Sequence, residues 1–430
     1  MKRNVGTLVF SLLMILLISM VSFAEAKIEL TVQTYWDPAM GSGMKLEQSF
    51  RDFMALHPNI EVKHIFLPRD QLVQRVLSQV LTDTLPDIVF ADNPWVRQWA
   101  EAGVYKDITP LIAQWEHYED FFQGTRDACT FQGRVYALQL VTNNLALYYN
   151  TDMFKELGIA EPPKTWDDIK TISAKITANL SGVYGLAFSA WDDEECTWQF
   201  EPFLWSNKGS LLELDQPEAV AALQFWTDLV SEGYTARDAL NWRQQDVTQQ
   251  FINRKTVMMI MGPWEITSQL KDVDFEYGIV PVPVPKAGYN PVSPMGGECF
   301  GMSSSIDPSK VEAAWQLIDY LVSPEHMADF TAAAATVPTR GSALEFVLDR
   351  DPRLEVFAKQ AEYALARTVV GGGEKYPEIS AIARSAIQRA LSGMMDPQTA
   401  FKQAADEIKE LWPIEEYEVL KNEVREIHNR

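Results

Sequence analysis

Three apolar segments alternate with two amphipathic segments near the start of the chain, and this order restricts the possible folds. The strand patterns cover residues 28–35, 60–66 and 86–91, and the helix patterns between them cover residues 44–56 and 71–81. Strands and helices that alternate without long insertions predict a mostly parallel sheet with helices on both faces. We therefore expect an α/β fold.

Polar and aromatic residues follow two of these predicted strands. Trp36 and Asp37 come directly after the first strand, and Asp92 and Trp95 come after the third. Ligands of open α/β sheets bind just beyond the carboxyl ends of the strands, so these four residues are candidates for a binding site. The structural alternative is that both tryptophans fill a core and that Asp37, before a proline, caps the next helix.

The segment 251–265, with the sequence FINRKTVMMIMGPWE, predicts a helix end, a short basic turn and a buried strand at residues 256–261. A nearly unbroken apolar run that stops at Gly-Pro is typical of a strand covered on both faces. Trp264 then follows the strand end and is a candidate platform for a ligand. The alternative is a core tryptophan under a loop.

A new series of strands and helices begins after residues 139–144, where we place a domain change. Residues 132–138 have the pattern of a strand, and another strand at 145–149 follows Asn143 and Asn144. Both amides are candidates for hydrogen bonds to a ligand.

Further candidates follow later strand patterns. A strand at 184–188 precedes Trp191 and Asp193, although the acidic run 192–195 also has the character of a solvated loop. The segment 217–231 carries the apolar stripe of a packed helix, so its tryptophan is not a candidate. The glycine turn at 294–302 contains Gly297 and Glu298, and glycine there allows a close backbone approach.

Composition excludes several classes of partner. The chain has 430 residues, 47% of them apolar, and a formal net charge of −22 at pH 7. This length suffices for two or three units with buried cores. Without a basic block, binding to nucleic acid or to an anionic membrane surface is not expected.

The first 26 residues have the pattern of a secretory signal peptide. Lys2 and Arg3 precede an apolar run at 8–21, and residues 24–26 read Ala-Glu-Ala. We expect cleavage after Ala26 and an exported, soluble chain. An uncleaved anchor is the alternative, because the run is near the length of a membrane span.

The three cysteines, Cys129, Cys196 and Cys299, are widely spaced, with no C-x-x-C and no histidine at ligand spacing. A zinc site is therefore not expected, and at most one disulfide can form within the chain. We predict that the thiols are buried as small apolar side chains, and we expect no metal or cofactor.

The candidate residues combine aromatic rings, which can cover apolar C–H faces of a ligand, with carboxylates and amides, which can bind hydroxyl groups. An exported glycosidase using paired acids such as Asp193 and Glu195 is an alternative, although G-x-S-x-G and H-E-x-x-H motifs are absent. A binder of peptides, polyamines or metal is a weaker alternative.

These segments together resemble the extracellular solute-binding proteins of ABC importers, in the branch that includes maltose-binding protein. Residues 251–264 are similar to the family pattern F-x-x-G-x-x-A-M-x-x-x-G-P-W, with Arg254 and Val257 in place of its Gly and Ala. Residues 136–150, 86–92 and 338–340 also fit, and the similarity extends over residues 27–412. The family's stacking aromatic in the helix 379–391 has no counterpart at Ser380 or Ala381.

The resemblance implies a two-lobed periplasmic-binding-protein fold, with each lobe a mostly parallel sheet flanked by helices and a hinge of crossing segments between them. It implies a first lobe of residues 27–139 and 296–338 and a second lobe of residues 140–295 and 339–430. It further implies a periplasmic or extracellular monomer that is not an enzyme, captures a sugar and delivers it to an ABC permease. The predicted ligand-binding residues are Trp36, Asp37, Asp92, Trp95, Asn143, Asn144, Trp191, Asp193, Trp264, Gly297, Glu298 and Arg340.

Overall fold

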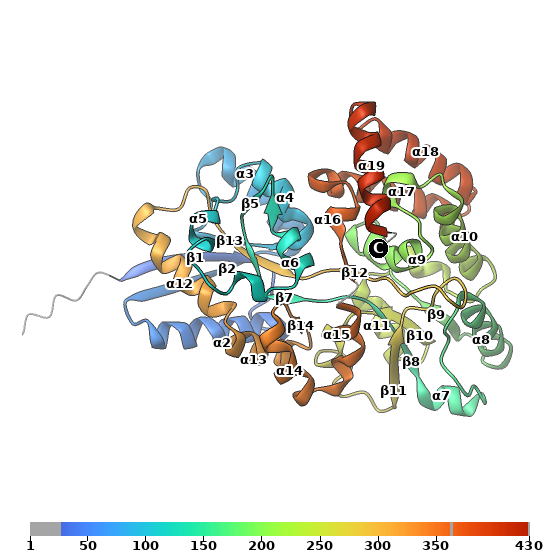
Figure 1. The fold of residues 1–430 in the computed structure, drawn as a ribbon. Helices are drawn as coiled ribbons and strands as arrows, with labels where there is room; N and C mark the ends of the chain where they lie inside the picture. The colour runs from blue at the N-terminus through green and yellow to red at the C-terminus, as the bar shows by residue number, and fades with distance from the viewer. Residues whose placement is uncertain (1–26, 362–363, 429–430) are drawn as a thin grey trace, which may run out of the picture.

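The protein consists of two α/β lobes joined by crossing segments (Figure 1). The structure is a computed structural model that describes residues 27–361 and 364–428. The predicted signal peptide, residues 1–26, lies outside the described residues. No helix within the described ranges combines the length and the apolar character that a membrane span requires.

The first lobe is built on a five-stranded sheet of the described residues. Its order is β2 (Ile60–Phe66), β1 (Ile28–Thr34), β3 (Ile88–Asp92), β13 (Glu298–Met302) and β6 (Leu138–Gln139). Strand β1 is parallel to β2 and β3, and β13 is antiparallel to both β3 and β6. Every strand of this sheet except β13 therefore runs in one direction, which agrees with the predicted mostly parallel sheet.

Helices cover both faces of the first sheet. Side chains alternate along β3, so that Ile88 and Phe90 join one core and Val89 and Ala91 join another. This explains why the strand reads as an unbroken apolar run. The helices of this lobe are α2 (Gly41–Leu56), α3 (Arg69–Thr82), α4 (Asn93–Glu101), α5 (Thr109–Ile112), α6 (Gln123–Ala128), α12 (Val311–Leu321) and α13 (Pro324–Ala334).

The second lobe contains a four-stranded sheet of the described residues. Its order is β11 (Tyr277–Pro281), β8 (Ala146–Asn150), β10 (Thr256–Met261) and β9 (Tyr184–Ala187). Strand β10 is parallel to β9 and antiparallel to β8, and β8 is antiparallel to β11. Only β8 is reversed among these strands. The strand predicted at residues 256–261 is confirmed, and all its residues are buried.

Ten helices of the described residues are assigned here to the second lobe, and α14 (Gly341–Arg350) is described below. The amphipathic helix predicted at 217–231 is confirmed as α10. The full set is α7 (Thr151–Glu156), α8 (Trp166–Asn179), α9 (Glu194–Ser206), α10 (Pro217–Ser231), α11 (Gln244–Ile252), α15 (Glu355–Ala361), α16 (Arg367–Val370), α17 (Tyr376–Leu391), α18 (Pro397–Lys409) and α19 (Ile414–His428).

Short strand pairs join the lobes, and Figure 1 labels three of their strands, β7, β14 and β12, between the two sheets. Strand β7 (Val141–Thr142) pairs with β14 (Val337–Pro338), and β12 (Pro294–Met295) pairs with β15 (Leu365–Ala366). Asn143 also bridges to Gly296. Gly297 has φ +125°, and a Cβ there would lie 2.0 Å from the carbonyl oxygen of Val141, so glycine permits this crossing.

The strand predicted at residues 132–138 is wrong as a single strand. Gln132 and Gly133 have φ of 48° and 74°, which produces a tight turn between β4 (Thr130–Phe131) and β5 (Arg134–Val135). Strand β6 begins only at Leu138, where it pairs with β13. The lobe boundaries at 139/140, 295/296 and 338/339 stay a prediction. Helix α14 (Gly341–Arg350), placed by them in the second lobe, packs against α13 of the first.

Candidate ligand-binding site

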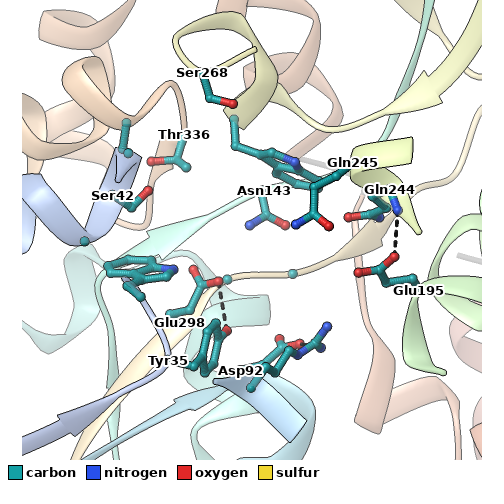
Figure 2. A pocket seen from close by; sticks show the side chains of 18 of the residues that line it. Tyr35, Ser42, Asp92, Asn143, Glu195, Gln244, Gln245, Ser268, Glu298 and Thr336 are labelled. Carbon is teal, nitrogen blue, oxygen red and sulfur yellow. Dashed lines mark hydrogen bonds and ion pairs between the residues drawn. The ribbon is translucent and has the colours of Figure 1, made fainter. Parts of the chain in front are cut away.

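A cavity of about 480 Å³ lies between the lobes, beyond the ends of β1, β3 and β10. This volume is in the range of small-molecule sites. Figure 2 shows Tyr35 and Glu298 on one side of the pocket and Glu195 and Gln244 on the other. Eight of the predicted site residues line it, namely Trp36, Asp37, Asp92, Asn143, Asp193, Trp264, Gly297 and Glu298.

The first-lobe wall is formed by the end of β1 and the start of β13. Trp36 is half-buried and stacks on Phe330, with ring centroids 5.5 Å apart. The Tyr35 hydroxyl donates a hydrogen bond of 3.1 Å to Glu298 (Figure 2). Burial raises the pKa of Glu298 to about 8, and the negative charge of Asp92 adds to this effect. The wall therefore offers an aromatic ring beside a carboxyl group that can accept or donate a hydrogen bond.

Trp264 stands on the opposite wall, directly after β10. A Cβ at Gly262 would lie 1.9 Å from the Trp264 ring, so only glycine lets the ring lie over the strand end. The Tyr148 hydroxyl donates a 2.8 Å hydrogen bond to the carbonyl of Gly262 and fixes this turn. The half-buried Trp264 side chain lines the cavity and also packs against the main cores. It thus has both a cavity-facing and a packing role.

The N-terminal end of α9 supplies further carboxylates. Asp193 caps this helix, accepting a 2.8 Å hydrogen bond from the backbone N–H of Glu195. Glu195 in turn accepts a 2.7 Å hydrogen bond from the backbone N–H of Gln244 (Figure 2). Burial raises the pKa of both carboxyl groups. This wall presents hydrogen-bond acceptors that are held in place by backbone donors.

A network of buried charges connects the two lobes beside the cavity. Asp92 accepts hydrogen bonds from Arg69 at 2.8 Å and from Arg367 at 2.6 Å. Arg367, with 2% of its side chain exposed, also donates to Glu194 at 2.7 Å and lies 4.5 Å above the ring of Trp198. Because buried charges are costly unless paired, this arrangement fixes the end of β3 relative to α9.

Four predicted site residues are not in the cavity lining. Trp95 stacks on Trp99 and supports Arg69, whose guanidinium lies 5.1 Å from its ring. Trp191 supports Arg243 in the same way, at 5.2 Å. Both tryptophans thus hold residues that line the cavity.

The other two make structural hydrogen bonds. The Asn144 side chain is fully buried, donates to the carbonyl of Phe357 at 2.8 Å and accepts from Gln360 at 2.8 Å. Arg340 donates to Asp120 at 2.8 Å and to the carbonyl of Val322 at 2.9 Å. The Arg340 guanidinium group therefore makes its hydrogen bonds within the protein rather than in the cavity.

Sequence reasoning missed a second set of lining residues, because they come from helix starts and loops that carry no strand-end signal. Only the acidic run 192–195, which contains Glu194, indicated one of them. They include Ser42, Arg69, Glu194, Trp198, Arg243, Gln244, Gln245, Ser268, Thr336 and Arg367.

Two α/β lobes with a polar and aromatic cavity at their junction define a solute-binding protein. A sequence profile described as bacterial extracellular solute-binding protein matches residues 48–356. The chain belongs to this family, as its resemblance predicted. Family members are binding proteins rather than enzymes.

Individual relatives agree with this assignment. A maltotriose-binding protein of Pyrococcus abyssi is 25% identical over 337 residues, covering 76% of this chain and 71% of the relative. The periplasmic sn-glycerol-3-phosphate-binding protein of Salmonella typhimurium is 23% identical, covering 60% of this chain and 63% of the relative.

Solved structures share the two-lobed fold. A solute-binding protein of Thermotoga lettingae bound with α-D-tagatose is 26% identical and has a TM-score of 0.80, covering 89% of this chain and 99% of that one. A maltose-bound protein of T. maritima is 26% identical and has a TM-score of 0.78, covering 90% and 100%. The predicted fold class is therefore confirmed.

Proposed function

We propose that the protein captures a sugar or an oligosaccharide in the cavity between its lobes and delivers it to a membrane ABC permease. The observation that carries the proposal is the convergence of Trp36 and Trp264 with the carboxyl groups of Glu298 and Glu195 around one cavity. Rings for C–H faces and acceptors for hydroxyls are what sugar recognition requires. The maltotriose-binding and maltose-bound relatives support a sugar ligand.

A phosphorylated solute is the alternative suggested by the sn-glycerol-3-phosphate-binding relative. The cavity lining argues against it, because six acidic residues face three arginines there. Two of the arginines, Arg69 and Arg367, already pair with Asp92. An anionic ligand would have to compete with that carboxylate for its cations, whereas a neutral sugar would not.

The hydrolase alternative receives less support from the arrangement of acids. Asp193 and Glu195 come from the same helix start, and each accepts a hydrogen bond from a backbone N–H. Glycoside hydrolysis needs two carboxyl groups that flank the scissile bond from opposite sides. The pair Asp193 and Glu195 does not have this arrangement, and the family consists of binding proteins. We propose that the protein binds its ligand without changing it and is exported through the segment 1–26.

Isothermal titration against a panel of neutral mono- and oligosaccharides tests the proposal, with sn-glycerol-3-phosphate, a short peptide and a polyamine as competing ligands. We expect heat from at least one neutral sugar, which is recovered unchanged. The proposal fails if the competing ligands alone bind, or if a glycosidic bond is cleaved.

Replacing the tryptophan after β10 tests the assigned site. Trp264→Ala should weaken sugar binding at least about tenfold, because stacking of this size contributes on the order of 1 to 3 kcal/mol. It should also lower stability, since the ring packs against both main cores. Trp412→Ala is the matched control, because Trp412 packs on the second-lobe core and does not line the cavity. Equal affinity in the two variants would remove Trp264 from the site.

A further inference from the structure

Two of the three cysteines lie side by side in the first lobe. Cys129 follows α6 and Cys299 is in β13, and their Sγ atoms are 3.5 Å apart. The exposed fractions of the two residues are 1% and 0%. Cys196 is buried in the core of the second lobe, so Cys129 and Cys299 form the single close pair among the described cysteines.

We propose that Cys129 and Cys299 form a disulfide bond when the chain folds in an oxidising compartment outside the cytoplasm. The two side chains already point at each other, and the sulfur atoms need to approach by about 1.5 Å to reach the bonded distance of about 2.05 Å. Disulfides form and persist in secreted proteins, and this chain belongs to an extracellular family. The proposal does not depend on which ligand the cavity binds.

The reaction is a thiol–disulfide exchange with a protein disulfide oxidant of that compartment. The thiolate of one cysteine attacks the oxidant's disulfide and forms a mixed disulfide, releasing one thiolate of the oxidant. The thiolate of the second cysteine then displaces the oxidant. The chain loses two protons and two electrons, and the oxidant leaves as a dithiol.

The buried position sets the order of events. Burial raises the pKa of the Cys299 thiol well above its usual range, and the neighbouring Cys129 adds to this effect. The reactive thiolate is therefore scarce once the core has closed. Oxidation has to occur while the chain folds, and a protein that has folded reduced should stay reduced for a long time.

The bond would link positions that are 170 residues apart. The loop it closes contains the crossing strand β7 and the whole second sheet, so it restricts the unfolded chain strongly. It would also hold the start of β13, where the neighbouring Glu298 lines the cavity. Cys299 Sγ further contacts the Gln139 side chain at 3.9 Å, at the first crossing segment.

Counting thiols in the exported protein tests the proposal. The full chain is exported to the periplasm of a bacterial host, purified without reductant, denatured and alkylated with iodoacetamide. We expect alkylation at Cys196 alone, and a peptide pair joined through Cys129 and Cys299 that separates on reduction. Alkylation of all three cysteines would overturn the proposal, as would a disulfide that contains Cys196.

A variant without the third cysteine provides the matched measurement. Cys196→Ala should take up no iodoacetamide before reduction and two equivalents after it. Uptake before reduction would again overturn the proposal. As a control, the same variant is produced without residues 1–26 in a reducing cytoplasm and kept anaerobic. Both of its thiols should react with iodoacetamide on denaturation, which would show that the assay distinguishes the reduced from the oxidised pair.

Discussion

Replacing Glu298 by glutamine should change how the stability of the protein depends on pH. Glu298 is half-buried beside Tyr35 and Asp92, and its pKa is raised from 4.5 to about 8. Between these values the folded protein holds a proton that the unfolded chain has released. Stability therefore falls as pH rises from about 4.5 to about 8, and the effect is complete above that range.

The size of this loss in the free energy of unfolding follows from the pKa difference between the folded and the unfolded protein. One pKa unit corresponds to about 1.4 kcal/mol, so a rise from 4.5 to about 8 corresponds to at most about 5 kcal/mol. Solvent in the cavity mouth screens the carboxylate and lowers this value to on the order of 2 to 4 kcal/mol. Glu298→Gln removes the titration while keeping an oxygen that accepts from Tyr35. The variant should gain stability over the wild type as pH rises.

Urea denaturation of the ligand-free protein between pH 5 and pH 9, followed by tryptophan fluorescence, measures the difference directly. The gap between Glu298→Gln and wild type should be small at pH 5 and widest at pH 9. Glu325→Gln, at an exposed position on α13, is the control and should run parallel to the wild type. A pH-independent gap for Glu298→Gln would refute the reasoning.

Other variants test the buried charges and a buried histidine. Arg367→Met leaves Asp92 and Glu194 without their shared partner and should cost about 3 to 5 kcal/mol in urea denaturation, whereas Lys402→Met in an exposed pair should cost less than about 1 kcal/mol. Equal losses would show that the network is not stabilising. Burial lowers the pKa of His326 from 6.5 to about 4, so stability should decrease by up to about 3 kcal/mol as pH falls through this window. His326→Gln should flatten this part of the curve, and an unchanged slope would contradict the assignment.

Fold and site differ in how far the sequence predicts them. Apolar runs identified β3 and β10 because each strand is covered on both faces, and the Gly-Pro stop located Trp264. The strand predicted at 132–138 failed because positive φ at Gln132 and Gly133 creates a hairpin turn. That turn depends on the backbone conformation of two residues, which periodicity does not report.

Eight of the twelve predicted site residues line the cavity, and the failures show what strand ends do not report. Strand ends identified the loops that contain Trp95 and Trp191, but their rings lie beneath Arg69 and Arg243 instead of facing the cavity. Arg367 follows the short strand β15 and reaches the cavity because β15 pairs with β12 across the junction. Such long-range pairing decides which side chains meet, and a single sequence does not contain that information in its local pattern.

The reversed strands have a mechanical consequence. Strand β8 follows shortly after the crossing residue Asn143, and β13 begins directly after the crossing residue Gly297. Each lies inside its sheet, with hydrogen-bonded strands on both sides. Each sheet therefore holds in place the strand that adjoins a crossing segment. We therefore expect a relative motion of the lobes to bend the short peptides between the sheets rather than the paired strands themselves. Those peptides carry Asn143 and Gly297, which line the cavity. A ligand that contacts them would thus contact the segments at which we expect the lobes to bend.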